Sequence, residues 1–329
     1  MTNWQGLQSN KTHTAKACSN LGLLISVIIT SYSLSRLQEA KDVLRSISAQ
    51  TTRNFEVVYV TERDHRLFDA IEQEVKMYDF KAVAIHNEGA PGLAEARNLG
   101  VSQASGDIVA FVDDDVVLSK GWTDAVERAF ETFPRTVGIT GPAYPLWMGK
   151  KREWLPVELD WLIGSTRWFG SDRVVEVRNC WGMNMAFRRN ELEEAGGFSV
   201  ETGYHRGKMA EDVELSLRLR AKTRMRILYV PRMLVWNKVN DYRLSNRFIM
   251  ERSRWIGYSR RYIRESVRTI NPGGADFDNK VLLGIVKSFV KPVNTARPSF
   301  ADVIEKYRAL LLVTACLLVG YLVGPMDLA

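Results

Sequence analysis

Four short apolar runs separated by amphipathic segments constrain the fold of this chain more than any other feature of its 329 residues. The runs span residues 24–30, 55–60, 81–85 and 108–112, and the segments between them, at 37–48, 67–77 and 95–103, have apolar residues near helical spacing. Short β-branched runs are typical of strands buried on both faces. Their alternation with helices predicts an α/β fold with a mainly parallel sheet flanked by helices, whose ligands gather beyond the carboxyl ends of the strands.

The same pattern continues into the second half of the chain. We expect helices at 122–133, 189–195 and 210–222, and strands at 137–141, 184–187, 227–230 and 234–236. Hydrophobic residues make up 46% of the chain and charged residues 25%, which predicts a packed core and excludes a wholly disordered, collagen-like or coiled-coil chain. We therefore predict a flexible leader over 1–22 and a Rossmann-like catalytic domain over 23–240.

Positive charge is concentrated in one segment near the C-terminus. Between Arg218 and Arg268 there are 15 Lys and Arg residues against 3 Asp and Glu, a net charge of +12, so the rest of the chain sums to −5 against the total of +7. This segment includes a basic, aromatic helix predicted at 241–270. Such a charge suits nucleic acid, an anionic membrane surface or a phosphate-bearing substrate.

The last segment, 271–329, is expected to associate with a membrane. Residues 309–326 are uncharged and would form a helix of about 27 Å, against a hydrocarbon core of about 30 Å. An amphipathic helix at 281–293 would lie beside it in the interface. The alternative is a buried C-terminal helix, because Gly320, Gly324 and Pro325 weaken a spanning interpretation.

Charge around this segment predicts where the large domain lies. Lys306 and Arg308 precede the apolar stretch, so the positive-inside rule favours a domain on the cytoplasmic face. Residues 1–20 are polar and lack the apolar region of a secretory signal. The three cysteines, at positions 18, 180 and 316, have no metal-ligand spacing, and they support neither a disulfide framework nor a zinc site.

Three consecutive carboxylates, Asp113, Asp114 and Asp115, follow the fourth apolar run. Like charges at a strand end repel one another in a partly desolvated cleft, so a positive group is expected to neutralise them. A hard divalent cation bound to one or two carboxylates and to phosphate oxygens is one solution. The alternative is a solvated cap before the helix that begins near Trp122.

Longer segments around this triplet identify a family. The run GLAEARNLGVSQASGDIVAFVDDDV (92–116), together with LISVIITSYSLSR (24–36) and GMNMAFRRNELEEAGGF (182–198), resembles the family 2 glycosyltransferases, which have the GT-A fold. The resemblance covers roughly residues 23–260. It implies that Asp115, with Asp113, holds Mg²⁺ or Mn²⁺ on the diphosphate of a nucleotide-sugar donor, and that Asp113 and the neighbouring Asp114 contribute to donor binding.

The resemblance also assigns nucleotide contacts elsewhere. Thr30 and Tyr32 stand where the family has Pro-Thr-Tyr-Asn after its first strand, and Glu62 stands in place of the Asp-Asp-Gly-Ser segment that grips the base. Arg97, in the EARN segment, is expected either to help hold the nucleotide or to pair with the aspartates.

On the acceptor side, Glu211 and Asp212 match the Glu-Asp pair of the family. An inverting transfer needs a carboxylate within hydrogen-bond reach of the acceptor hydroxyl, and we assign that general-base role to Asp212. The alternative is that an acidic residue here complements the dipole of a helix N-terminus, which applies to Glu211 in particular.

Five further positions are predicted to contact the diphosphate or the acceptor. Two of them, Gly182 and Asn184, begin the GMNMAF segment, and Asn237 stands where the family commonly has His. The other two, Arg254 and Trp255, lie in ERSRW, which resembles the Gln-x-x-Arg-Trp element of some members. A solvated basic helix face is the alternative for ERSRW.

These observations predict a metal-dependent, inverting glycosyltransferase that uses a nucleotide sugar and a membrane-presented acceptor, either polyprenyl-linked or a glycan. No nucleic-acid partner is expected. A nicotinamide-dependent oxidoreductase is the first rival, but the segment after the first strand lacks Gly-x-Gly-x-x-Gly. A non-catalytic protein that binds anionic lipid or nucleic acid is the second rival, because the basic segment alone would serve it.

Overall fold

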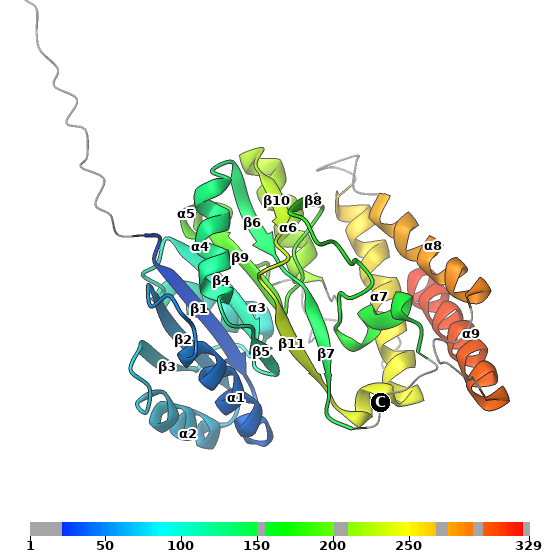
Figure 1. Cartoon of the computed structure of the whole chain (residues 1–329), viewed down its shortest axis with the longest axis horizontal. Coiled ribbons are helices and arrows are strands. Elements are labelled where there is room, and N and C mark those ends of the chain that lie inside the picture. The colour runs from blue at the N-terminus through cyan, green and yellow to red at the C-terminus, as the bar shows by residue number, and fades with distance from the viewer. Residues whose placement is uncertain (1–21, 150–154, 201–209, 268–275, 292–298, 325–329) are drawn as a thin grey trace, which may run out of the picture.

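Parallel strands form one half of an eight-stranded sheet at the centre of the protein (Figure 1). The computed structural model describes residues 22–149, 155–200, 210–267, 276–291 and 299–324, so all but the last residue of the leader predicted over 1–22 lies outside the described residues. Strands β1 (Ile25–Ser31), β2 (Phe55–Glu62), β3 (Lys81–Asn87) and β4 (Ile108–Asp113) pair in the order β3-β2-β1-β4, all parallel. Their bounds lie close to the four predicted runs.

The other half of this sheet is mixed. Its order continues β9 (Asn184–Arg188), β6 (Thr136–Thr140), β10 (Arg226–Tyr229) and β8 (Val175–Val177). Strand β9 runs antiparallel to both β4 and β6, whereas β10 is parallel to β6. The predicted strand at 234–236 belongs to a second, three-stranded sheet formed by β5 (Val116–Leu118), β11 (Val235–Val239) and β7 (Ala143–Trp147).

Helices cover both faces of the large sheet, because each buried strand presents alternate side chains to opposite faces. On one face, Val27, Ile29 and Val57 pack with α1 (Leu37–Ser48), α2 (His65–Val75) and α4 (Trp122–Thr132). On the other face, Ile28 and Val58 pack with α3 (Leu93–Gln103), α5 (Arg189–Glu194) and α6 (Glu211–Thr223). This doubly covered sheet has the layers expected of an α/β fold.

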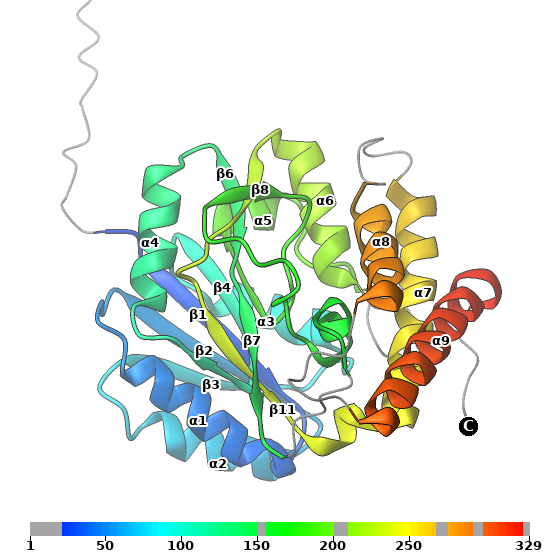
Figure 2. The same cartoon turned by 45° about the vertical axis from the view of Figure 1, so that its right-hand side comes forward.

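The C-terminal helices are α7 (Asn246–Val267), α8 (Asp276–Val290) and α9 (Phe300–Val323). Figures 1 and 2 show them beside one another, on the side of the molecule away from β1, β2 and β3. They share a third core cluster with the short helices η2 (Val157–Ile163) and η4 (Asp241–Leu244). This cluster crosses the boundary predicted at residue 240, because Val239 and Leu159 pack in it together with Leu310 of α9.

Candidate active site

Strand pairing brings the predicted site residues to one edge of the large sheet. Thr30 of β1 pairs with Asp113 of β4, and Val112 pairs with Asn184 of β9. Since parallel strands end at the same edge, the end of β1 and the acidic triplet lie side by side. The antiparallel strand β9 begins at this same edge, and Gly182 lies just before it.

Two arginines bind the last two carboxylates of the triplet. Asp114 and Asp115 are each 4% exposed. Arg36, from η1 (Leu34–Arg36), donates from Nε to Asp114 Oδ2 at 2.7 Å and lies 3.1 Å from Asp115 through Nη2. Arg243, from η4, donates to Asp115 Oδ2 at 2.5 Å. Positive groups that neutralise the triplet, as expected, are therefore present as guanidinium groups of the chain itself.

The carboxylate of Asp114 is buried and held by hydrogen bonds from the protein itself. It also accepts a hydrogen bond from the Ser31 hydroxyl. Burial raises the pKa of Asp114 to about 6, although the charge and hydrogen bonds of Arg36 act in the opposite direction. Asp113 differs, because its side chain keeps 39% exposure at the surface of the cleft. Of the three carboxylates, Asp113 is the most accessible to a ligand.

Arg97 of α3 links the triplet to the acceptor side. This side chain is 3% exposed, and it donates to Asp113 Oδ1 at 3.4 Å, to Glu211 Oε1 at 3.1 Å and to the carbonyl of Gly182 at 3.1 Å. Of the two roles predicted for Arg97, the structure shows the pairing with the aspartate. One guanidinium thus fixes the distance between the end of β4 and the start of α6.

Asp212 lies on the other side of the Gly182 segment. Its Oδ2 accepts from the backbone N–H of Gly182 and its Oδ1 from that of Val213, both at 2.8 Å. Burial, reinforced by the charge of Glu211, raises the pKa of Asp212 to about 6. The residue before this pair, Ala210, has φ of 113°, a left-handed conformation that non-glycine residues seldom adopt.

Asp212 borders a cavity of about 190 Å³ between α6, α7 and the loops before β9. Three tryptophans and three arginines contribute to its wall: Trp161, Trp168, Trp181, Arg178, Arg252 and Arg260. Aromatic faces beside charged hydrogen-bond donors suit a sugar joined to a phosphate. The cavity is therefore a candidate acceptor site.

Several predicted contacts lie outside this cleft. Asn184 is fully buried and donates to the carbonyls of Pro142 and Met233, and Asn237, 2% exposed, donates to those of Ile163 and Gly164. The structure corrects both predictions, because these amides hold backbone segments together. In and next to ERSRW, Arg252 and Ile256 of α7 line the cavity, whereas Arg254 and Trp255 are not among its lining residues. The predicted contacts of Arg254 and Trp255 stay predictions.

The residues predicted to bind the base lie at the ends of β1 and β2. Glu62 is 6% exposed and its Oε2 accepts from the Gly92 N–H at 2.7 Å. Tyr32 is 51% exposed, with the guanidinium carbons of Arg36 and Arg63 at 5.7 and 5.9 Å from its ring centroid. The roles of Thr30, Tyr32 and Glu62 in nucleotide binding stay predictions.

Sequence reasoning missed Arg36, Arg243 and Arg252. Arg36 closes the LISVIITSYSLSR segment, so its place after the first strand was the one signal available for it. Arg243 and Arg252 lie in the basic segment, whose many similar side chains conceal which of them turn inward. For Arg252, a helical count from Ile249 and Ile263, both buried, would have indicated the inner face of α7.

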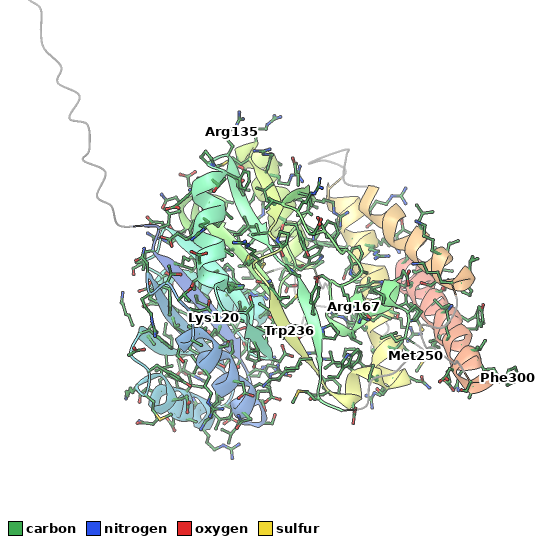
Figure 3. The ribbon with its side chains drawn as sticks, viewed as in Figure 1. Lys120, Arg135, Arg167, Trp236, Met250 and Phe300 are labelled. Carbon is green, nitrogen blue, oxygen red and sulfur yellow. The ribbon has the colours of Figure 1, made fainter. Side chains whose placement is uncertain are left out.

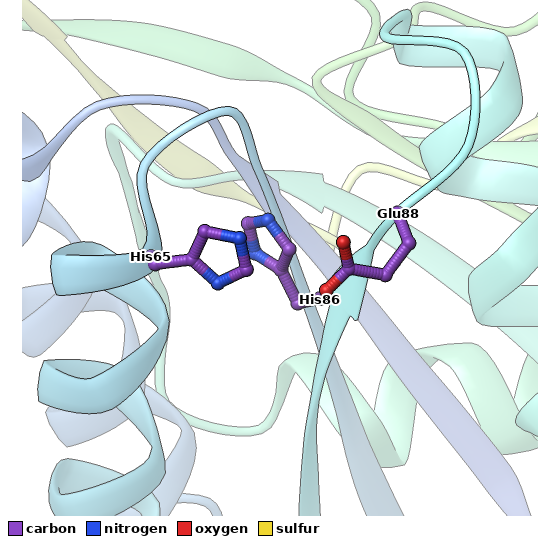
Figure 4. A group of neighbouring side chains, drawn as sticks. All are labelled: His65, His86 and Glu88. Carbon is purple, nitrogen blue, oxygen red and sulfur yellow. The ribbon is translucent and has the colours of Figure 1, made fainter.

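A separate group of metal-ligating side chains lies near the end of β3 (Figure 4). One ligand atom each from His65, His86 and Glu88 lies within 4.8 Å of the others, and the His86 Nδ1 is 3.0 Å from the Thr61 hydroxyl. Bonds of about 2.1 Å would require these atoms to draw closer. Imidazole favours Zn²⁺ or Cu²⁺, whereas Mg²⁺ and Mn²⁺ favour oxygen ligands such as the acidic triplet.

The fold and the cleft define a glycosyltransferase with the GT-A fold. Residues 26–196 match the sequence model of the family described as "Glycosyl transferase family 2", and the chain belongs to this family. Among characterised relatives, it is 30% identical over 307 residues to the glucosyl-dolichyl phosphate glucuronosyltransferase of Haloferax volcanii, a similarity that covers 91% of this chain and 96% of the relative.

Solved structures agree with this fold. The mannosyltransferase PcManGT of Pyrobaculum calidifontis, in complex with GDP-Man and Mn²⁺, superposes with a TM-score of 0.61 at 16% identity, over 94% of this chain and 89% of that one. GalNAc-T7 with UDP, GalNAc and Mn²⁺ gives a TM-score of 0.51 at 16% identity, over 67% of this chain and 44% of that one. Both similarities concern the fold, and both of those structures contain Mn²⁺.

Proposed function

We propose that this glycosyltransferase moves a sugar from a nucleotide-sugar donor to a hydroxyl group of a polyprenyl-phosphate-linked sugar, with inversion at the anomeric carbon. The relative from Haloferax volcanii supports the acceptor class, because its name describes a glucosyl-dolichyl phosphate acceptor and the similarity spans nearly its whole length. The name of the same relative makes a nucleotide-activated hexuronate the first donor to test. The reaction is expected at the cytoplasmic face of a membrane.

One observation carries this proposal: Arg97 joins the donor and acceptor sides of a single cleft. It binds Asp113 of the acidic triplet and Glu211, while the carbonyl of Gly182 accepts from it and the N–H of Gly182 donates to Asp212. A general base and a metal-binding carboxylate placed in this way suit transfer between two bound substrates.

The acidic triplet fits a hard divalent cation. Asp113 and Asp115 supply carboxylate oxygens, the ligands that Mg²⁺ and Mn²⁺ prefer. Such an ion, when bound, neutralises the charge that develops on the departing diphosphate. Arg36 and Arg243, which now lie against Asp115, are placed to turn to the diphosphate oxygens, because a planar guanidinium suits bidentate contacts to phosphate.

Asp212 is the proposed base. Its two carboxylate oxygens are oriented by the backbone N–H groups of Gly182 and Val213. A pKa of about 6 leaves the carboxylate ionised at neutral pH, yet more basic than an ordinary Asp. It takes the proton of the acceptor hydroxyl as the oxygen attacks the anomeric carbon opposite the diphosphate. A bare lipid phosphate would need no such base, which is why we propose a hydroxyl acceptor.

The test separates donor binding from transfer. In a thermal-shift screen of nucleotide sugars with and without Mn²⁺, the matching donor is expected to raise the melting temperature of the wild-type protein only when Mn²⁺ is present, because ligands that bind the native state stabilise it. Asp115→Ala should abolish this shift. Asp212→Asn should keep it and lose transfer by about 10²–10⁴-fold, the usual contribution of a general base.

The control variant is Asp79→Asn, whose side chain is 77% exposed and far from the cleft in the sheet order. It should leave both measurements unchanged. Near-normal turnover of Asp212→Asn would exclude the general base, and an unchanged metal dependence of Asp115→Ala would exclude the ligand assignment. Retention of the donor anomeric configuration in the product, measured by NMR, would exclude inversion.

A further inference from the structure

Helix α9 has two faces with different surroundings. It is 24 residues long, and its most apolar 18-residue stretch has a mean hydropathy of 1.6, so its length and composition suit a membrane crossing. However, 28% of that stretch is buried in the protein. The buried positions Ala309, Leu310, Val313, Leu317 and Gly320 recur at helical spacing and form one stripe. The other face is exposed.

The buried stripe fastens α9 along the side of α7. A Cβ atom placed on Gly257 of α7 would lie 2.2 Å from the Leu317 carbonyl oxygen, and one on Gly320 would lie 2.0 Å from that of Arg254. Near the end of both helices, Arg261 donates to the carbonyl of Leu322 at 3.1 Å. The two backbones are therefore in direct contact through their glycines, and Figures 1 and 2 both show the helices side by side.

This attachment conflicts with a membrane crossing by α9. If α9 crossed the hydrocarbon core while attached, it would draw α7 in with it, and α7 carries six arginines, at positions 247, 252, 254, 260, 261 and 264. Charged side chains within the hydrocarbon are costly. If α9 separated from α7 instead, Leu310 and Val313 would leave the core cluster that they share with Leu159 and Val239 of the catalytic domain.

Helix α8 packs beside α9, where the Tyr307 hydroxyl donates to the carbonyl of Phe289, and it has exposed apolar side chains of its own. We call the exposed apolar surface of the two helices the apolar platform, and its main side chains are Val286, Val290, Ile304, Leu311, Leu318 and Leu322, each at least 49% exposed. A groove of about 750 Å³ beside Leu311 is bounded on its other side by Met250 of α7. Figure 3 marks Met250 and Phe300, the latter 81% exposed at the start of α9.

The charge around the platform favours one partner. The formal charges of α8 and α9 cancel, with four basic and four acidic residues, and Arg308 pairs with Glu305. The positive charge therefore comes from α7, which has six arginines against two glutamates and packs against α9. An apolar surface with a strongly basic helix packed beside it suits the interface of a bilayer that contains anionic lipid.

We propose that α8 and α9 lie flat in the interface of an anionic bilayer, with the apolar platform against the hydrocarbon and with no crossing by α9. This inference deepens the membrane location given under the proposed function and depends on it. In this orientation α7 stands between the bilayer and the cavity beside Asp212. The phosphate of a lipid-linked acceptor would then meet Arg252 and Arg260 near the level of the lipid head groups.

Depth measurements distinguish a flat helix from a crossing one. Nitroxide labels are attached to cysteines introduced one at a time at positions 304, 311, 318 and 322 of the full chain, with Cys18 and Cys316 replaced by Ser and the fully buried Cys180 kept. The protein is bound to phosphatidylcholine–phosphatidylglycerol vesicles. Relaxation by oxygen and by a water-soluble nickel complex reports the depth of each label. A flat helix gives similar shallow depths at all four positions.

A crossing helix instead gives depths that rise toward the middle of the helix and fall again at its other end, and that result would overturn the inference. Labels that stay in water at all four positions would overturn the membrane location in the proposed function as well. Donor-induced thermal shifts of the labelled proteins are independent of both outcomes, so failure of the glycosyltransferase proposal is recognised separately.

Substitutions provide the second test. The triple variant Leu311→Ser, Leu318→Ser, Leu322→Ser is expected to bind these vesicles at least tenfold more weakly in a flotation assay. The matched control replaces three exposed apolar residues elsewhere, Met77, Val83 and Val174, with Ser. The control should bind as the wild type does. Equal binding by both triple variants, or a platform that proves to join two copies of the chain in sedimentation, would overturn the proposal.

Discussion

Asp212 combines two requirements that oppose each other. A base must be ionised, but burial favours the neutral carboxyl group. Two backbone N–H groups stabilise the charged form, and the net result is a pKa of about 6. The strained backbone of Ala210 directly precedes this pair, in agreement with the observation that uncommon conformations cluster at functional sites.

The pKa of Asp212 predicts a pH profile. Because the ionised form accepts the proton, kcat should be constant above about pH 7 and fall about tenfold per pH unit below about pH 6. Glu211→Gln removes the negative charge that raises this pKa, so the acidic limb should move to lower pH. The measurement is kcat against pH at saturating donor and acceptor. If Glu211→Gln left the acidic limb of the kcat profile at the same pH, the assignment of this limb to Asp212 would be wrong.

Arg243 is predicted to compete with the metal ion for Asp115. Without donor, Arg243→Ala should bind Mn²⁺ roughly tenfold more tightly, because one neutralising charge is gone, a change of about 1.4 kcal/mol. Donor binding should weaken in the same variant, since a contact to the diphosphate is lost. Electron paramagnetic resonance of free Mn²⁺ measures the first effect.

Arg247→Ala is the matched control, because Arg247 is 85% exposed and pairs with Glu251. This variant should change neither affinity. If Arg243→Ala moved both affinities in the same direction, the idea that the arginine passes from carboxylate to diphosphate would be wrong.

Strands defined by a local sequence pattern lie close to where the sequence predicts them. The runs that become β1, β2 and β4 are β-branched and buried on both faces, so nothing outside them is needed to define them. Strands β5, β7 and β8 were not predicted. Two of them are three residues long, and β7 contains Pro145; their pairings with β10 and β11 join distant parts of the chain.

The site residues also divide into those that a local motif identifies and those that only long-range contacts bring into place. Asp113, Asp115 and the pair at 211 and 212 lie in continuous motifs, and the sequence points to them directly. Arg36 and Arg243 reach the triplet across 78 and 128 residues, so that their contacts depend on tertiary structure. Asn184 was misassigned because a polar residue at a strand start resembles a ligand contact until its buried partners are known.

The contact between α7 and α9 gives a prediction at the level of elements. Gly320→Val should force the helices apart, because even a Cβ would lie 2.0 Å from the Arg254 carbonyl oxygen, and overpacking of this kind costs about 1–3 kcal/mol. Hydrogen exchange should then increase throughout α9 and stay unchanged in β1 and β4.

Gly284→Ala in α8 is the control, since the nearest atom to its added Cβ, on Glu158, lies 3.8 Å away. This substitution should be neutral or should stabilise the helix by about 0.5–1 kcal/mol. Equal effects of the two substitutions would show that α9 is not held by close backbone contact.

At the scale of the whole molecule, charge and apolar surface lie toward the same end. The segment from Arg218 to Arg268 carries a net +12, and α7 within it packs directly on the helix that forms the apolar platform. The sheet edge with the proposed donor site is built from the less basic remainder of the chain. The protein is therefore electrostatically polarised, with its most basic part next to the proposed membrane face.

This polarity predicts a salt dependence. Binding to anionic vesicles should weaken markedly between about 0.05 and 0.5 M salt, because the screening length falls well below about 10 Å over that range. Binding to purely zwitterionic vesicles should be weaker and nearly independent of salt, since it rests on apolar contact alone. Flotation at several salt concentrations measures both. Identical curves for the two lipids would argue against an electrostatic contribution.

The arrangement of Arg243 and Arg252 has a practical consequence for anyone who shortens the chain to obtain a more tractable protein. Both side chains come from the region after residue 240, yet one neutralises Asp115 and the other forms part of the wall beside Asp212. Trimming at residue 240 would thus remove Arg243 and the α7 side of the cavity wall together with the apolar C-terminal helices. A usable truncation has to keep η4 and α7 and to replace the outward leucines of α9 rather than delete the helix.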